Sequence, residues 1–149
     1  MAQNLDQIGL RSIISDYDLF FIDIWGVIHN GIKLNKNAVE VLNKLSSLKK
    51  DFVLLTNAPR PNETVVKFLK KMGLHSHHSN VFTSGEAALR YLVEELNNKK
   101  FYHIGPPRDF DLFKSFIKLK VKNINDSEYL LCSGLFDDHS EDLNYYKSF

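Results

Sequence analysis

This sequence of 149 residues lacks the features that mark the specialised classes of protein. It has one cysteine, Cys132, which excludes an internal disulfide; its apolar neighbours predict a buried strand position and not a catalytic thiol. No apolar run approaches the roughly 18 residues that a membrane-spanning helix needs, so we expect no membrane association. The first residues lack a basic stretch followed by an apolar one, so we expect no signal peptide and a cytoplasmic location.

An excess of charge of one sign is also missing. Nineteen lysines and arginines stand against eighteen aspartates and glutamates, which gives a formal net charge of +1. Nucleic acids and anionic membranes attract proteins mainly through an excess of positive charge, so neither is an expected partner. The hydrophobic share of 44% and the charged share of 25% are typical of a globular chain with its own core.

Apolar periodicity predicts strands that alternate with helices. The predicted strands are short apolar runs at residues 18–25, 52–56, 81–84, 101–105 and 129–132, the first of them continuous enough to be covered on both faces. The predicted helices are at residues 5–15, 37–50, 63–72, 86–96 and 111–119. This alternation favours an α/β fold with a largely parallel sheet. The polar segment 97–100 indicates a domain junction, which divides the chain into 1–98 and 99–149.

One acidic residue, Asp23, interrupts the first apolar run, which extends from Phe20 to Ile28. A carboxylate among large apolar side chains is costly unless it is paired, bound to a cation or placed at an opening. In doubly wound sheets the carboxyl ends of the strands border the ligand crevice, where a carboxylate can be presented. A structural aspartate that caps a turn is the alternative.

The second predicted strand ends in Thr56 and Asn57, just before a helix that begins near Pro61. Because parallel strands end at the same edge of a sheet, we expect Thr56 and Asp23 to face one crevice. Hydroxyl and amide donors near a helix N-terminus favour a phosphate dianion. A capping turn is the alternative interpretation of these two residues.

Three segments together resemble the haloacid dehalogenase superfamily. Asp23-Ile-Trp-Gly-Val27, followed by a glycine-bearing hairpin, resembles its first motif, and Leu54-Leu-Thr-Asn-Ala-Pro-Arg60 resembles its second. The segment 81–92 resembles the last core strand and helix before the cap in the class IIA branch of sugar- and nucleotide-phosphatase-like proteins. The resemblance implies a Rossmann-like core in residues 1–98 and the beginning of an α/β cap domain in residues 99–149.

The resemblance also implies a role for each matched residue. Asp23 would be the nucleophile that forms an aspartyl-phosphate, and it would share a Mg²⁺ ion with the backbone carbonyl of Trp25. Thr56 and the backbone amide of Asn57 would bind the phosphoryl group, and Gly26 would let the chain turn sharply beside it.

Several further residues have two interpretations each. His29 follows the first motif and Arg60 ends the second, so both are candidate substrate contacts; an ordinary hairpin residue and a surface arginine are the alternatives. The histidines at 75, 77 and 78 predict a solvated loop, with metal binding as the alternative. Gly105-Pro-Pro-Arg108 is either an anion-binding strand end or a Pro-Pro turn.

Two departures from the family pattern affect the expected activity. Trp25 occupies the position at which the phosphatases have a second aspartate, whose acid–base help is worth about 10²–10⁴-fold. Dehalogenase members carry an aromatic residue there, so haloacid chemistry is an open alternative. The family's lysine and later metal-binding aspartates have no match; Asp137 and Asp138 are expected in the cap and not at a metal. The implied Mg²⁺ site is therefore weak.

These observations predict a phosphatase-type hydrolase that acts on a small phosphate ester, either a sugar phosphate or a nucleotide, with impaired activity in this chain. The alternative is a non-catalytic remnant or half-protein that binds phosphate ligands or a complementary chain. An incomplete sheet would leave an unpaired edge and would favour a homo-oligomer. The sequence identifies neither the substrate nor the origin of the short chain, for which a truncated gene product, a split gene and a single expressed domain are alternatives.

Overall fold

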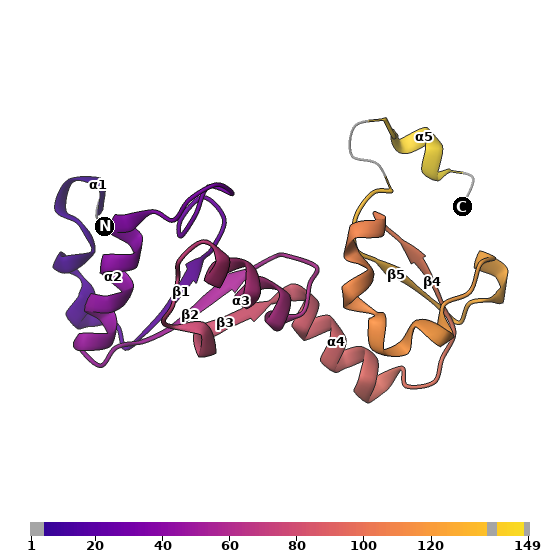
Figure 1. Ribbon diagram of the computed structural model, residues 1–149, viewed down its shortest axis with the longest axis horizontal. Helices are drawn as coiled ribbons and strands as arrows, with labels where there is room; N and C mark the ends of the chain where they lie inside the picture. Colours follow the sequence, from indigo (N-terminus) through magenta and orange to yellow (C-terminus); the bar gives the residue numbers. More distant parts are fainter. Residues whose placement is uncertain (1–4, 137–139, 148–149) are drawn as a thin grey trace. The chain divides into compact units, whose positions relative to one another are not determined.

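The computed structural model describes residues 5–136 and 140–147 of the chain. Contacts within the chain divide it into two compact units, which we call the first unit (Met1–Thr56 with Val66–Phe82) and the second unit (Asn57–Val65 with Thr83–Phe149). Each unit has its own parallel sheet, one of three strands and one of two (Figure 1). The α/β fold with parallel strands that the periodicity predicts is therefore confirmed.

The first unit is built on the three-stranded sheet, in the order β1-β2-β3. Its strands are β1 (Leu19–Asp23), β2 (Asp51–Thr56) and β3 (Val81–Thr83). The helices that connect them are α2 (Lys36–Ser47) and α3 (Asn62–Lys71); the first turn of α3 and Thr83 of β3 group with the second unit. β1 and β2 are parallel, in a register that places Leu19 opposite Asp51 and Asp23 opposite Leu55. The two strands therefore end at the same rim of the sheet.

The core of the first unit comes from the central strand and from one side of each helix. Phe52 and Leu54 of β2 are buried, as are Leu42 and Leu45 on one side of α2 and Leu69 of α3. The spacing of three between Leu42 and Leu45 places both on one helix face, as the apolar periodicity predicts. The buried side chains of β2 thus anchor the strand whose last residue is Thr56.

β1 lies at the edge of the sheet, and one of its faces is open. Exposure alternates along the strand, and Leu19 and Phe21 are 47% and 67% exposed. Leu55 of β2 shares this face and is also exposed. The expectation of a first strand covered on both faces is therefore wrong for the described part of the chain. Periodicity reports that a strand is apolar, whereas its cover depends on which elements pack against it.

The predicted N-terminal helix is shorter than expected. α1 spans only Leu5–Ile8, and two 3₁₀ turns follow at Leu10–Ser12 and Ile14–Asp16. None of these elements buries a side chain, so no packed face extends the helix across the predicted range 5–15.

The second unit contains α4 (Ser84–Glu95) and the parallel pair β4 (Phe101–Ile104) and β5 (Tyr129–Cys132). Its core is one apolar cluster of buried side chains from these three elements and from residues 112 and 113. Leu92 of α4 belongs to this cluster, so the helix groups with the second unit although it precedes the predicted junction at 97–100. The assignment of the parts as catalytic core and cap stays a prediction.

Two local predictions in the second unit are wrong. The expected helix over 111–119 is a pair of 3₁₀ helices, Pro107–Leu112 and Lys114–Leu119. Hydrogen bonds from the Asp109 N–H to the Pro106 carbonyl and from the Phe113 N–H to the Phe110 carbonyl span three residues, which is the 3₁₀ pattern. Cys132 is exposed and not buried, because alternation along β5 places its neighbour Leu131 in the core.

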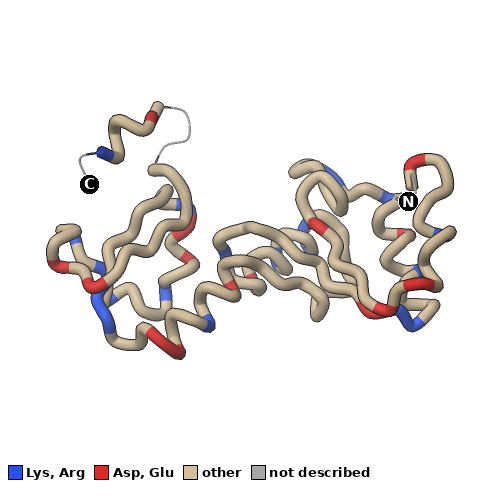
Figure 2. Tube along the Cα trace, turned by 180° about the vertical axis from the view of Figure 1, so that it is seen from behind, with Lys and Arg blue, Asp and Glu red and all other residues tan. Residues whose placement is uncertain are grey.

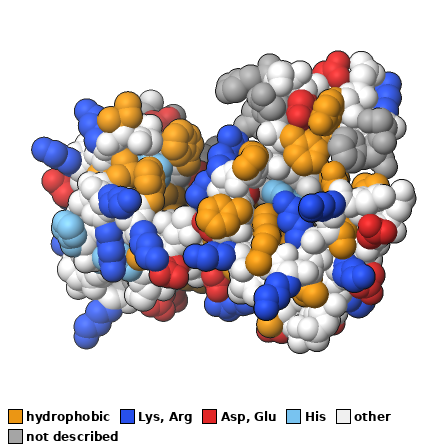
Figure 3. Space-filling view, turned by 45° about the vertical axis from the view of Figure 1, so that its right-hand side comes forward, with side chains coloured by type: hydrophobic (Ala, Val, Ile, Leu, Met, Phe, Trp, Pro, Cys, Tyr) orange, Lys and Arg blue, Asp and Glu red, His pale blue; other side chains and the backbone are white. Residues whose placement is uncertain are grey.

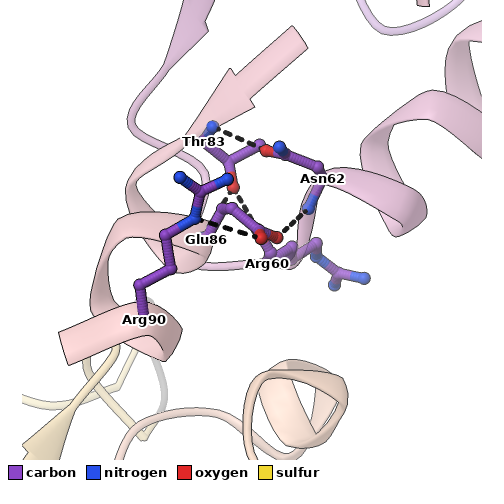
Figure 4. A network of polar contacts seen from close by, with 5 residues as sticks. All are labelled: Arg60, Asn62, Thr83, Glu86 and Arg90. Carbon is purple, nitrogen blue, oxygen red and sulfur yellow. Dashed lines mark hydrogen bonds and ion pairs between the residues drawn. The ribbon is translucent and has the colours of Figure 1, made fainter. Parts of the chain in front are cut away.

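A polar network joins segment 57–65 to the start of α4 within the second unit (Figure 4). Thr83 caps α4 by accepting from the Glu86 N–H at 2.9 Å, and its hydroxyl donates to the Arg60 carbonyl. The Asn62 side-chain oxygen accepts from the Thr83 N–H at 2.9 Å, and the Asn62 backbone N–H donates to Glu86 Oε2 at 3.1 Å. Thr83 is fully buried, so these bonds satisfy groups that have no access to water. The network holds the chain that follows β2 in one conformation.

Residues of both charges are scattered along the described part of the chain (Figure 2). On the face shown in Figure 3, lysine and arginine side chains lie among acidic ones, and hydrophobic side chains gather between them. No helix among residues 5–136 and 140–147 is long and apolar enough to cross a bilayer.

We expect Gly85→Ala to destabilise the protein even though alanine favours helices. A Cβ at residue 85 would overlap the backbone of Arg60, and backbone cannot move aside as a flexible side chain can. The free energy of unfolding should fall by about 1–3 kcal/mol, measured by urea unfolding followed by circular dichroism. Glu94→Ala, at an exposed position of the same helix, is the control and should leave stability within about 0.5 kcal/mol. Equal stability of the two variants would contradict the close approach at Gly85.

Because one face of β1 is open, we expect alanine substitutions at two apolar residues on neighbouring strands to differ in their cost to stability. Leu54→Ala removes a fully buried side chain and should cost about 2–5 kcal/mol. Phe21→Ala removes a larger side chain that is mostly exposed and should cost less than about 1 kcal/mol in the monomer. Urea unfolding at low protein concentration measures both, and a cost at Phe21 as large as that at Leu54 would show that this face is covered.

Candidate functional site

The candidate site is the rim of the first sheet, where β1 ends at Asp23 and β2 ends at Thr56. Asp23 lies in register with Leu55, and Thr56 is the next residue along β2. Because side chains alternate along a strand, Asp23 belongs to the exposed face and Thr56 to the buried one. The two residues therefore share the rim but not a face of the strands. A ligand that meets both of them has to lie over the ends of the strands.

Asp23 is exposed, which explains how the chain tolerates an acid inside a run of large apolar residues. The carboxylate stands at an opening, the third of the arrangements that lower the cost of such a charge. Its Oδ1 accepts a hydrogen bond from the Ile24 N–H at 2.8 Å, which orients the group. An oriented, accessible carboxylate can attack an electrophile at the rim.

The loop after β1 folds back on itself and is anchored by two buried isoleucines, Ile24 and Ile28. The Ile28 N–H donates to the Ile24 carbonyl at 2.9 Å, and the Gly26 N–H donates to the His29 carbonyl at 2.8 Å. Gly26 has a φ of +78° with open space around it, so the backbone conformation and not crowding requires glycine there. The sharp turn that the sequence predicts beside Asp23 is present.

His29 is buried within this loop, where the sequence suggests a hairpin residue that contacts substrate. Its Nδ1 accepts from the Gly31 N–H at 2.9 Å, so the neutral ring carries its proton on Nε2. The ring makes edge contacts with Trp25 and Phe68, each with a centroid distance of 5.3 Å. Burial lowers the pKa of His29, which favours the neutral form. Through these contacts the His29 side chain stabilises the loop.

Trp25 stands two residues beyond Asp23 with its side chain 63% exposed. The benzo part of its indole lies against Gly31, where a Cβ would approach Trp25 Cη2 to 2.7 Å. The backbone of Trp25 forms an isolated bridge with that of His29. The sequence singled out Trp25 for its backbone carbonyl and missed this arrangement, although Gly31 was visible as a loop glycine.

Asn57 and Arg60 belong to the second unit, and so are described apart from the rim. The Asn57 carbonyl accepts from the Ser84 hydroxyl at 2.8 Å, which fixes the backbone of this segment on the first residue of α4. The Arg60 guanidinium lies 3.8 Å from the buried carboxylate of Asp109 and 3.7 Å from that of Asp111, and it donates to the Arg108 carbonyl. Arg60 is thus engaged with the Pro107–Leu112 helix, and is not an unengaged surface arginine.

The donor set for Mg²⁺ is small. No group of three or more histidine, cysteine, aspartate or glutamate side chains that could hold a metal occurs among the described residues. Asp23 supplies one exposed carboxylate, and the Thr56 hydroxyl and backbone carbonyls of the loop are neutral oxygens of the same rim. Mg²⁺ accepts such a sparse set only together with waters and substrate phosphate oxygens. The residues present therefore fit at most a weakly bound Mg²⁺ ion that is also coordinated by the substrate phosphate.

The other candidates from the sequence lie elsewhere or are already engaged. His77 lies within hydrogen-bonding distance of the Asn43 side chain, and His78 of the Leu74 carbonyl, so this loop packs on its own unit. Pro106 and Pro107 begin a 3₁₀ helix, which supports the turn interpretation of that segment. Asp137 and Asp138 lie outside the described residues.

One polar pair in the second unit has no counterpart in the predictions. His103 Nε2 lies 2.8 Å from the Ser133 hydroxyl, at the adjacent ends of β4 and β5. A Cβ at Gly105 would overlap the Ser133 oxygen, so the glycine at the end of β4 leaves room for this bond. Burial and the nearby Lys120 lower the pKa of His103, whereas Asp109 raises it. The bond closes the ends of the two strands, and the strand-end glycine was its only signal in the sequence.

Comparison with known proteins identifies the family. The sequence profile of the haloacid dehalogenase-like hydrolases matches residues 20–116, which contain the Asp23 and Thr56 rim. No curated protein sequence matches the chain at a significant level.

Solved structures share the fold. A haloacid dehalogenase-like hydrolase from Brucella suis is 26% identical with a TM-score of 0.74, and the match covers 99% of this chain and 54% of that one. A 4-nitrophenylphosphatase from Thermotoga maritima is 21% identical with a TM-score of 0.65, over 91% of this chain and 50% of that one. A glycerol phosphate phosphatase from Mycobacterium tuberculosis, solved with magnesium, is 20% identical with a TM-score of 0.58, over 89% and 40%.

The chain therefore spans about half the length of the first two of these proteins and less of the third. The profile match covers well over half of this chain and includes both motifs at the rim. The chain belongs to the haloacid dehalogenase-like hydrolase family, and its fold is that of the class IIA branch.

Proposed function

We propose that this chain is a phosphatase-type hydrolase that acts on a small phosphate ester, a sugar phosphate or a nucleotide, through an aspartyl-phosphate on Asp23. The observation that carries the proposal is an exposed, oriented carboxylate at the end of β1, on the rim where β2 ends in Thr56. The family match supports hydrolase chemistry, and phosphatases are among the proteins of similar fold. A cytoplasmic location and the absence of nucleic-acid or membrane partners belong to the same proposal.

The proposed reaction has two steps. A carboxylate oxygen of Asp23 attacks phosphorus, the bond from phosphorus to the ester oxygen breaks, and the leaving group departs with the electron pair and takes a proton from water. Water then attacks the aspartyl-phosphate, which releases inorganic phosphate and restores the carboxylate. Because Trp25 has no proton to give, the first step runs without general acid help from that position, and turnover should be slower by about 10²–10⁴-fold than with an acid there.

The residues around Asp23 would bind and orient the phosphoryl group. Thr56 would donate its hydroxyl over the rim, and the Asn57 backbone amide would add a second donor. Gly26 keeps the loop close to the strand end without a side chain. His29 and Arg60 are proposed substrate contacts whose side chains are also engaged within the protein, so each would contribute chiefly by holding its loop in place.

Mg²⁺ has a limited part in the proposal. The Asp23 carboxylate and the Trp25 backbone carbonyl would hold the ion, weakly and together with substrate phosphate. When bound, Mg²⁺ would neutralise charge on the transferring phosphoryl group.

The nucleophile is tested by Asp23→Asn, which keeps the size of the side chain but removes its charge. With phenyl phosphate as substrate and Mg²⁺ present, phosphate release should fall by roughly 10³-fold or more, to the level of a blank. Asp18→Asn, which alters an exposed carboxylate just before the same strand, is the matched control and should keep full turnover. Turnover that survives in Asp23→Asn would exclude the proposed mechanism.

A second candidate function follows from the open face of β1. The chain would be a half-protein that pairs with a complementary chain or with a second copy through Leu19, Phe21 and Leu55. Parallel sheets are normally covered on both faces, and an uncovered edge strand invites pairing.

The oligomeric state of the purified chain tests the half-protein hypothesis. We expect light scattering over a concentration series to show association that Phe21→Lys weakens by at least about 10-fold, because the charge is costly in an apolar contact. Tyr91→Lys, at an exposed aromatic residue of the second unit, should leave the association unchanged. A wild-type chain that stays monomeric throughout, with Asp23-dependent turnover, would favour the phosphatase over this alternative.

A further inference from the structure

The loop after β1 holds the indole of Trp25 in one orientation. Gly31 has a φ of +88° and no Cβ, and a methyl group there would approach Trp25 Cη2 to 2.7 Å and Cζ3 to 3.1 Å. The buried ring of His29 meets the indole edge to face, with an interplanar angle of 89°, and is itself fixed by the Gly31 N–H. The indole is therefore supported by the loop and is not a loose surface side chain.

The rest of the indole is open. Trp25 is 63% exposed, although the loop around it is anchored by the buried residues Ile24, Ile28 and His29. A large aromatic surface that is fixed on one side and accessible on the other is suited to stacking against a second planar ring, because little conformational entropy is lost on binding.

We propose that Trp25 is a stacking platform that selects phosphate esters with a flat aromatic leaving group at the Asp23 rim. This inference rests on the proposed function and deepens it by naming the substrate class. Trp25 follows Asp23 by two residues, in the loop that continues from the end of β1. In this proposal the group that departs from phosphorus at Asp23 would meet the exposed indole, which has no proton to donate.

Tryptophan offers an aromatic surface and donates no proton to a leaving group, and both properties favour aryl phosphate esters. Stacking of two aromatic rings adds about 0.5–1.5 kcal/mol beyond simple burial, which an aliphatic leaving group does not gain. A phenol has a pKa of about 10, as in tyrosine, so a phenolate departs with its electron pair far more readily than the anion of an aliphatic alcohol. The phenolate of an aryl ester can therefore leave without acid help and take its proton from water afterwards, while the phosphoryl group stays on Asp23.

The exposed indole has one competing explanation. It would be an interface residue if the open face of β1 extends to it and a partner covers both. Trp25 differs from Phe21 in being supported by Gly31 and His29 within its loop, and this support favours the platform.

Binding of two matched phosphonates to the full chain tests the platform without requiring turnover. Phenylphosphonate and cyclohexylphosphonate carry six-membered rings of similar size on the same charged group, but only the first ring is flat. Trp25 is the only tryptophan of the chain, so its fluorescence reports directly on the proposed site. We expect phenylphosphonate to change the emission saturably and to bind about 3- to 10-fold more tightly than cyclohexylphosphonate by calorimetry.

Two variants test the loop, and one serves as a control. Trp25→Leu should bind the two phosphonates equally, because the flat ring then has no aromatic partner. Gly31→Ala keeps the tryptophan but displaces its ring, and should reduce the preference for phenylphosphonate over cyclohexylphosphonate to below about 2-fold. This variant also tests the platform if Trp25→Leu fails to fold. Ile32→Ala changes the most exposed apolar residue of the same loop and should keep the full preference.

The outcomes separate this inference from the proposed function. Equal affinity of the wild-type chain for the two phosphonates, with phosphate binding and Asp23-dependent turnover intact, would overturn the platform and leave the phosphatase in place. A change in self-association on Trp25→Leu without any change in ligand preference would assign the indole to an interface and overturn the platform too. Failure to bind inorganic phosphate and both phosphonates would remove the phosphate site itself, and the platform with it.

Discussion

The parallel pairing of β1 with β2 is the interaction on which the candidate site depends. It brings Asp23 and Thr56, 33 positions apart in the sequence, to one rim of the sheet. The pairing also makes β1 an edge strand of this sheet, with Phe21 on an open face. The strand that carries Asp23 thus also carries Phe21, whose side chain is 67% exposed. Catalysis and pairing with a partner are therefore linked proposals for the same strand.

Two segments that follow the paired strands are held by different means. The loop after β1 is fixed by buried isoleucines and by His29, whose lowered pKa reflects its burial. The segment after β2 is fixed by the Thr83 and Asn62 network and by the ion pairs of Arg60 with Asp109 and Asp111. Neither holding device requires a ligand, so both segments have a defined conformation before a substrate binds. Such preorganisation is what a phosphoryl-transfer site needs, since its catalysis depends mainly on positioning and electrostatics.

Trp25 has two opposite consequences in the proposed function, because it lacks a proton to donate but offers an aromatic surface. In the proposed function Trp25 supplies no proton to the leaving group, and the sequence alone supports only that negative expectation. Within the folded loop it becomes an oriented aromatic surface, because Gly31 leaves room for the ring and His29 supports its edge. In the proposed function, the same residue would slow one class of substrate and favour another.

The sequence by itself determined the alternation of strands and helices, the family and the residues at the strand ends, because apolar periodicity and short motifs are local properties of the chain. It could not determine that Asp23 and Thr56 belong to opposite faces, that Arg60 pairs with Asp109, or that α4 contributes Leu92 to the second core. It also predicted a covered first strand and a helix at 111–119, where the structure has an open face and two 3₁₀ helices. Those features were decided by the tertiary structure, since register, cover and long-range ion pairs depend on which distant segments come to lie together.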